Sequence, residues 1–517
     1  MTFLNESFLA GDGQLAAPAG DQTNLPRAPV GPRRGGYARI HPDSLAWLIA
    51  AALAFALAVL LLTPLRMGLS WDEIVYASQI SKHVPPMQWG PHRARGLPLL
   101  AAPVTLLTGS VLVLRIYLAI LAGAGMFLAL LAWRGLKPAW VLALAALEFG
   151  GLGMVQSQAS QLFPNYWIAL CGVAAVGLFL QGWTRTDPPR RIFVLLAVAT
   201  AFSTLMRLPD GVVLTVPLLV VATGSLMRRS MARRSAALLL ALLAGLAVGC
   251  GEWLIEAYMY FHGPAARLAG TTKAVGGTKF DPLQSLRVID GGATAYFGGW
   301  SHPRLLFWWL IFALLALLGI YVTRRARGWV FAMLPAVCAL GVYALYTLPI
   351  RDNARYLLPA WALLALPAAD GIAWLAGQSR GRLRFATAAL AVVFLAAELG
   401  TQHAVLVRQS AQLQAAARAN VNAVNALRQL GINGHCFMSS VPHPFGASPT
   451  GPAAYYLGCG YTRYVKNPHK VANRRQIVLV RTPGQPWGYA RAWPAHILNG
   501  TGVNGNGNMV AYIEPTG

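Results

Sequence analysis

The sequence predicts an all-α membrane protein that crosses the bilayer many times and carries a small α+β domain at its C-terminal end. Hydrophobic residues make up 56% of the 517 residues and charged residues only 11%, whereas soluble domains are about 25% charged. Apolar stretches long enough to cross a bilayer recur along the chain. Short β-like runs between Pro and Gly turns follow near the end, at 476–481 and 509–513.

The chain begins with a polar segment, 1–44, that is rich in Pro and Gly. No small-residue cleavage site follows the first apolar stretch, so we interpret this segment as a disordered cytoplasmic tail rather than a signal peptide. A transmembrane domain over 45–403 comes next, with about eleven spans. The predicted limits of the spans are 46–65, 111–133, 138–155, 163–183, 191–208, 211–227, 235–261, 304–322, 328–348, 355–376 and 383–403.

The net charge of +25 predicts the orientation of these spans. If the basic tail is cytoplasmic, the Arg-dense short loops are cytoplasmic too, as the positive-inside rule requires. These loops are 185–191, 228–234, 324–327 and 380–384. The apolar segment 97–108 is too short to span comfortably, and counting it as a span would put all four loops outside. We therefore expect a re-entrant or juxtamembrane helix there. No basic module of a known type is present, which disfavours nucleic-acid binding.

The same topology places the long connecting segments on the extracytoplasmic side. These segments are the first outer loop 66–110, then 262–303, 349–355 and the domain 404–517. We expect this last domain to begin with a helix over 405–430. Charged and polar residues from several helices meet at this boundary, as a site for an amphiphilic substrate requires.

The five cysteines fall into two groups. Cys171, Cys250 and Cys338 lie in predicted spans and read as small apolar residues. Cys436 and Cys459 lie in the outer domain, where an oxidising compartment favours a disulfide between them. No set of ligands with zinc spacing surrounds this pair.

An acidic pair, Asp72 and Glu73, follows the first span in a chain with only 17 acidic residues against 42 Lys and Arg. Ser70 and Glu73 have the spacing of a capping box that opens a helix. Asp72 lies in the first turn of that helix, where the helix dipole favours the ionised carboxylate. An ionised carboxylate can accept a proton from a substrate hydroxyl. We predict that this pair belongs to a catalytic site with Asp72 as the base; the alternative is a plain helix start.

Four motifs resemble the GT-C superfamily of glycosyltransferases that use polyprenyl-phosphate sugars, and within it the protein O-mannosyltransferase and aminoarabinose transferase branch. The motifs are WDE at 71–73, HRARGLPLLAAP at 92–103, FSTLMRLPDGVVL at 202–214 and NARYLLPAWALLALP at 353–367. The resemblance extends over 46–403, and the domain that follows matches no known family.

The resemblance implies an inverting transfer of a sugar from a polyprenyl-phosphate donor to an extracytoplasmic hydroxyl of a glycan, lipid or protein acceptor, in the bacterial inner membrane. Asp72 would be the general base, with Glu73 beside it. Arginine suits the lipid phosphate because its guanidinium group forms a bidentate fork. The candidates for binding this phosphate are His92, Arg93, Arg95, Arg207, Lys273, Arg351, Arg355 and Tyr356. We expect no metal or other cofactor, with a divalent ion as the alternative.

Two further polar groups are weaker candidates. Glu252 and Glu256 share one helix face, where they either line the cavity or form an interhelical hydrogen bond. A polar cluster that could touch sugar hydroxyls comprises Gln156, Gln158, Gln161, Asn165 and Tyr166. Two other classes of function stay open: a transporter or flippase, and a lipid-linked glycan polymerase or ligase. Transporters usually show internal repeats, and no such repeat is found.

Overall fold

The computed structural model describes residues 44–274, 308–347, 354–378, 382–440, 450–462, 474–481, 484–502 and 507–515. Residues 1–43 of the predicted tail and the candidate Arg351 lie outside this described part.

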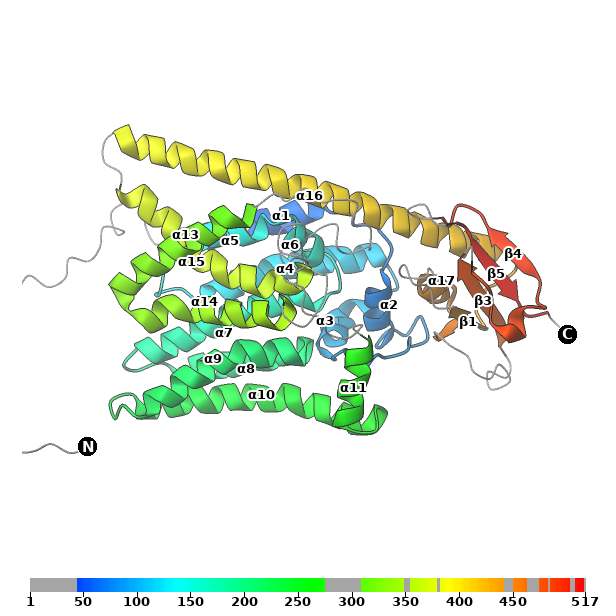
Figure 1. The fold of residues 1–517 in the computed structure, drawn as a ribbon, viewed down its shortest axis with the longest axis horizontal. Helices are drawn as coiled ribbons and strands as arrows, with labels where there is room; N and C mark the ends of the chain where they lie inside the picture. The colour runs from blue at the N-terminus through cyan, green and yellow to red at the C-terminus, as the bar shows by residue number, and fades with distance from the viewer. Residues whose placement is uncertain are drawn as a thin grey trace, which may run out of the picture. The chain divides into compact units, whose positions relative to one another are not determined.

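Helices make up most of the described chain (Figure 1). From the N-terminal side they are α1 Ala46–Leu62, α2 Trp71–Ser78, α3 Gly96–Thr105, α4 Val111–Leu131, α5 Ala139–Gly150, α6 Gly153–Ala159, α7 Pro164–Thr184, α8 Arg190–Met206, α9 Leu208–Leu226, α10 Ala232–Tyr260 and α11 Pro264–Ala274. Beyond the gap they are α13 Trp308–Arg327, α14 Trp329–Thr347, the 3-10 turn η3 Ala354–Leu357, α15 Leu358–Gln378, α16 Arg382–Gln429 and α17 Thr450–Leu457.

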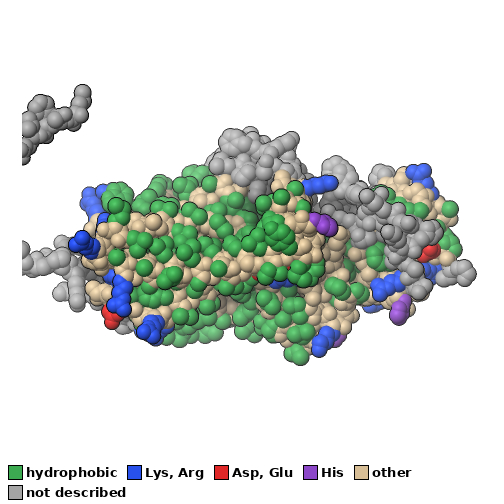
Figure 2. All heavy atoms as spheres, turned by 90° about the horizontal axis from the view of Figure 1, so that it is seen from below, with side chains coloured by type: hydrophobic (Ala, Val, Ile, Leu, Met, Phe, Trp, Pro, Cys, Tyr) green, Lys and Arg blue, Asp and Glu red, His purple; other side chains and the backbone are tan. Residues whose placement is uncertain are grey.

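The helices confirm the predicted class of multi-pass membrane protein. In the described part, seven helices are long and apolar enough to cross a membrane, and the bent pair α5–α6 would make an eighth. A helix lies at each predicted span, although α1 and α8 have only 17 residues each. Hydrophobic side chains cover the helical region on the face that Figure 2 shows, and Lys and Arg side chains gather at its left-hand end. The short apolar helix α3 lies where we expect a re-entrant or juxtamembrane helix.

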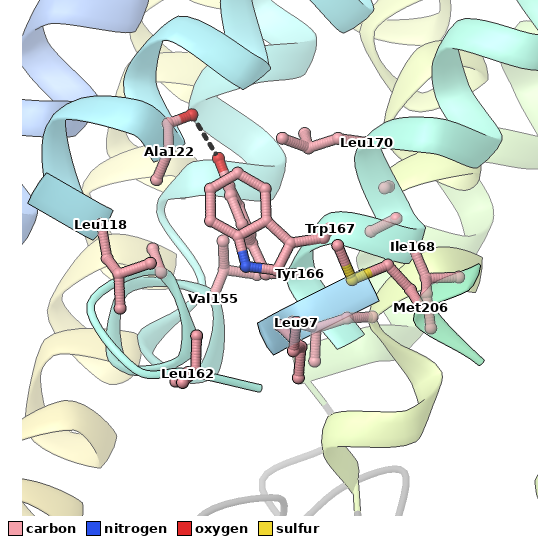
Figure 3. Packing of buried hydrophobic residues seen from close by; sticks show 14 of the residues in the cluster. Leu97, Leu118, Ala122, Val155, Leu162, Tyr166, Trp167, Ile168, Leu170 and Met206 are labelled. Carbon is pink, nitrogen blue, oxygen red and sulfur yellow. Dashed lines mark hydrogen bonds between the residues drawn. The ribbon is translucent and has the colours of Figure 1, made fainter. Parts of the chain in front are cut away.

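The centre of the helical region is formed by α7 and α15, since 83% of the apolar stretch of each is buried. Tyr166 of α7 is fully buried, and its hydroxyl donates to the backbone oxygen of Ala122 on α4 at 2.8 Å (Figure 3). Its ring stacks on Phe55 and Phe149. This packing joins α1, α4, α5 and α7 into one core beneath the first outer loop.

One predicted span is broken. The span expected over 138–155 ends with α5, and α6 follows at an angle of 87°. The break allows α16 to approach closely. A Cβ at Gly153 would collide with the backbone oxygen of Gln402 on α16. The N–H of Gly153 donates instead to the side-chain oxygen of Gln402 at 3.1 Å.

The last predicted span and the first helix of the outer domain form one continuous helix. α16 has 48 residues, so it runs without interruption through the boundary expected at 403–404. Figure 1 shows it leaving the helical region and reaching the sheet. Ala, the best helix former, is frequent on both sides of this boundary. The domain limits drawn from the sequence stay a prediction.

The C-terminal sheet has five strands in the order β2-β1-β3-β5-β4. The strands are β1 Cys436–Ser440, β2 Gly460–Thr462, β3 Arg475–Arg481, β4 Ala495–Leu498 and β5 Met509–Ile513. β1 pairs in parallel with β2 and β3, and β5 pairs antiparallel with β3 and β4. A disulfide joins Cys436 to Cys459 at the β1 and β2 end of the sheet, as predicted. The two predicted β-like runs correspond to β3 and β5.

Candidate active site

The acidic pair lies at the start of α2, on a helix that begins with the predicted capping box. Glu73 accepts a hydrogen bond from the backbone N–H of Ser70 at 2.9 Å. Its carboxylate is fully buried and also accepts from both terminal nitrogens of Arg115 on α4 and from the backbone N–H of Leu162, at 2.9 Å. Glu73 therefore ties α2 to α4 and to the turn before α7. A carboxylate enclosed in this way holds α2 in position.

Asp72, next to Glu73, is partly exposed, whereas Glu73 is fully buried. The side chain of Asp72 is 28% exposed and contacts two guanidinium groups. Nη2 of Arg93 donates to Oδ1 at 2.6 Å, and Nη2 of Arg355 donates to Oδ2 at 3.4 Å. Arg355 lies 283 positions further along the chain, on the η3 turn that leads into α15. The fold thus brings the first and the last of the four sequence motifs together.

The charges around Asp72 set its protonation state. Burial of the carboxyl raises its pKa, but the guanidinium groups of Arg93 and Arg355 outweigh burial and hold the pKa well below the usual range. His92 lowers the pKa of Asp72 further, by a smaller amount. Asp72 is therefore an ionised carboxylate between two cations.

Aromatic rings fix both guanidinium groups. The Cζ atom of Arg93 lies 4.8 Å from the ring centre of Tyr76, on the same helix as Asp72. The Cζ atom of Arg355 lies 4.6 Å from the ring centre of Phe163. Both arginine side chains are largely buried, at 4% and 11% exposure. Such contacts stabilise a cation in a partly dry site.

Arg207 belongs to a neighbouring cluster. Its Nη1 atom donates to the Tyr346 hydroxyl at 3.2 Å, and the guanidinium lies 3.6 Å from the buried carboxylate of Asp210. The Tyr346 hydroxyl donates to the same carboxylate. Tyr356 stacks on Tyr346 and also faces the Arg207 guanidinium, 4.6 Å from its ring centre. The Cζ atom of Arg355 lies 5.4 Å from the centre of the same ring, so Tyr356 contacts both guanidinium groups.

Arg95, a candidate for binding the lipid phosphate, forms an ion pair with Glu256. Its Nε atom donates to Glu256 on α10, and Nη1 donates to Gln79 at 3.3 Å. Glu256 also accepts from Arg267 of α11 at 2.9 Å. We expected Glu252 and Glu256 either to line a cavity or to form an interhelical hydrogen bond. Glu256 bonds to other elements of the protein, as in the second alternative. His92 and Lys273 are exposed on the loop before α3 and on α11, respectively.

Two functional arginines escaped the sequence reasoning. Arg115 is 1% exposed and holds Glu73; its signal was a lone charge inside a predicted span. Arg267 is fully buried and donates to the backbone oxygens of Pro91 at 3.1 Å and Arg93 at 2.9 Å. It therefore positions the loop that carries Arg93. No sequence pattern marks Arg267 among the many basic residues of the loops.

The predicted polar cluster near the first turn of α7 is buried. Its members are at most 9% exposed and bond within the protein. The side-chain nitrogen of Asn165 donates to the side-chain oxygen of Gln158 at 3.1 Å, for example. These side chains are enclosed in the protein interior, and the hypothesis of sugar contacts stays a prediction. Within the described residues, no three His, Cys, Asp or Glu side chains are grouped to hold a metal ion. The expectation about cofactors stays a prediction.

No family model and no curated protein matches the sequence. Solved structures do. ArnT from Cupriavidus metallidurans in the apo state matches with a TM-score of 0.60 at 14% identity, over 91% of this chain and 97% of that chain. The same protein bound to undecaprenyl phosphate matches with a TM-score of 0.57 at 12% identity, over 90% and 98%. The apo oligosaccharyltransferase of Archaeoglobus fulgidus matches with a TM-score of 0.54 at 15% identity, over 84% and 69%.

The chain has the GT-C fold. The resemblance predicted from the four motifs is thereby confirmed at the level of the fold, together with the multi-pass membrane class. At this identity a shared GT-C fold does not fix the reaction, which has to be argued from the residues around Asp72.

Proposed function

We propose that the protein is an inverting membrane glycosyltransferase that moves a sugar from a polyprenyl-phosphate donor to an acceptor hydroxyl. The observation that carries this proposal is the contact of one partly exposed carboxylate, Asp72, with two largely buried guanidinium groups. The GT-C fold supports it, since one protein with this fold is described as bound to undecaprenyl phosphate.

The two kinds of side chain suit the two halves of the reaction. The acceptor oxygen attacks the anomeric carbon, the bond from that carbon to the phosphate oxygen breaks, and the hydroxyl proton passes to Asp72. The leaving group is a polyprenyl phosphate, which needs cations rather than a proton. Arg93 and Arg355 supply two forks for its oxygens. Attack from the face opposite the phosphate inverts the anomeric centre.

The orientation follows from the charge distribution. We place the Arg-rich loops in the cytoplasm, and Asp72 and the sheet domain outside, in a bacterial inner membrane. The donor phosphate would then lie at the outer boundary of the bilayer, beside η3. The sugar is a hexose or a pentose, and the acceptor is a glycan, a lipid or a protein. No metal takes part in the proposed reaction.

The proposal is tested by turnover of undecaprenyl-phosphate sugars in nanodiscs. A panel of radiolabelled pentose and hexose donors is incubated with the protein and cell-envelope acceptor fractions, and labelled product is measured. Asp72→Asn should lower turnover of the active donor by at least about 100-fold, the usual contribution of a general base. Asp187→Asn alters the net charge by the same amount but lies on an exposed loop, so it should leave turnover unchanged. Near-normal turnover in Asp72→Asn would remove Asp72 from the mechanism.

A further inference from the structure

The arrangement around Asp72 makes it a poor base as it stands. Its two oxygens accept from Arg93 at 2.6 Å and from Arg355 at 3.4 Å. A general base works best when its pKa lies near the working pH, and these cations hold the pKa of Asp72 far below it, against the opposing effect of burial. Something must loosen these ion pairs before Asp72 takes up a proton efficiently.

The exposed fractions show from which side this can happen. The Asp72 side chain is 28% exposed, whereas those of Arg93 and Arg355 are 4% and 11% exposed. The carboxylate is therefore the most open member of the cluster, and the cations lie behind it. An anion that enters from the open side meets Asp72 before it reaches either guanidinium group.

We propose that the Asp72 carboxylate occupies the anion-binding position of the donor-free enzyme, and that the donor phosphate displaces it from Arg93 and Arg355. This inference rests on the proposed function. Two guanidinium groups and one carboxylate carry a net charge of one positive unit, which attracts a phosphate. A phosphate offers more acceptor oxygens to the two forks than a carboxylate does. No covalent bond changes in this exchange.

The exchange couples donor binding to catalysis. After it, Asp72 has lost its cationic partners to the phosphate and has an anion as its neighbour. Both changes favour the protonated carboxyl. Asp72 therefore becomes a stronger base only when a donor is present, and the donor-free enzyme keeps it inactive.

The rival arrangement is that phosphate and Asp72 bind different sides of the same guanidinium groups at the same time. The two arrangements predict opposite effects of removing the carboxylate charge. If Asp72 competes with the phosphate, its removal tightens phosphate binding. If the two bind together, Asp72 holds the guanidinium groups in place, and its removal leaves phosphate binding equal or weaker.

The experiment is equilibrium binding of undecaprenyl phosphate to the full-length protein in nanodiscs. Asp72→Asn should bind about tenfold more tightly than the wild type, because a charge that repels the phosphate at close range is gone. Asp187→Asn is the matched control, since it removes one acid from an exposed loop, and it should bind like the wild type. If Asp72→Asn does not fold, Asp72→Ser removes the same charge and carries the same expectation.

A double variant gives an independent readout. Arg355→Gln should weaken binding, and Asp72→Asn added to it should restore affinity toward the wild-type value. Equal or weaker binding in Asp72→Asn would overturn the exchange and leave the proposed function intact. Absence of saturable binding to the wild type would overturn both. Competition by inorganic phosphate at concentrations as low as those of the lipid would show that the site is built for free phosphate, and would reject the exchange with a lipid-linked donor.

Discussion

Two neighbouring acids on α2 perform different tasks because their surroundings differ. Glu73 is enclosed by four donors from Ser70, Arg115 and Leu162, whereas Asp72 is partly exposed and contacts two arginines. The one-residue step along a helix turns the side chain by about 100°, which is enough to separate core from cavity. Residue identity alone does not reveal which acid has which task.

Glu73→Gln should destabilise the protein strongly. The substitution leaves the Arg115 guanidinium, which is 1% exposed, without its counter-charge. Breaking a fully buried ion pair costs about 3–5 kcal/mol, more than the roughly 1 kcal/mol of a lost cap. Thermal unfolding in detergent checks this, with Asp187→Asn as the control. A melting temperature close to that of the wild type would show that Glu73 is not needed to anchor α2.

Arg355→Ala should weaken the use of donor by about 10–150-fold, because a charge-assisted hydrogen bond contributes roughly 1.5–3 kcal/mol. Arg355→Lys should recover only part of this, since lysine keeps the charge and loses the fork. The measurement is the donor dependence of transfer in nanodiscs. An unchanged donor response in Arg355→Ala would assign the phosphate to Arg93 or Arg207 instead.

At the scale of elements, the loop that carries Arg93 depends on the corner between α10 and α11. Arg267 donates to backbone oxygens at both Pro91 and Arg93, and Glu256 binds Arg267 and Arg95 together. This corner fixes the path of the loop before α3. Arg267 and Glu256 therefore position the loop of Arg93, and in the proposed reaction they would act only through Arg93.

Arg267→Lys should raise the KM for donor by about tenfold and change kcat less, because one ammonium group cannot replace several charge-assisted bonds to the loop. A general loss of folding would lower the amount of active protein without raising the KM. Steady-state kinetics on protein matched for folded fraction separates the two results. Thr272→Ser, an exposed change on the same helix, should leave both constants as they are.

The elements also show which features a sequence can predict. Hydropathy locates each span, since an apolar stretch of the right length has few alternatives. The break between α5 and α6 accompanies a close approach of α16 at Gly153, and this tertiary contact joins residues far apart in the sequence. In the same way, Asp72, Arg93 and Arg355 were found by motif, but the pairing of Arg95 with Glu256 joins residues 161 positions apart. Such pairing is decided by packing.

At the scale of the whole molecule, charge is distributed unevenly along the direction of the helices. Lys and Arg side chains gather at one end of the helical region (Figure 2), and the sheet domain lies at the other end (Figure 1). This separation is what the positive-inside rule describes. It supports one orientation for the whole chain.

Cysteine labelling tests that orientation. A membrane-impermeant reagent added from outside should label a cysteine introduced at Asn499, which is exposed beyond β4. It should not label one at Ser230, which is exposed between α9 and α10. After the membrane is permeabilised, both should react. Labelling at Ser230 and not at Asn499 in intact cells would reverse the orientation and move Asp72 to the cytoplasmic side.

The sheet domain is attached to the helical region by more than its covalent connection. The backbone N–H of Leu69, directly before the cap of α2, donates to the Tyr456 hydroxyl of α17 at 2.8 Å. The ring of Trp71, the first residue of α2, lies 4.9 Å from that of Tyr461. A shortened protein that ends at residue 403 would cut α16 and strip the start of α2 of these contacts. A recombined gene that replaces the C-terminal part must therefore also supply new partners for Leu69 and Trp71.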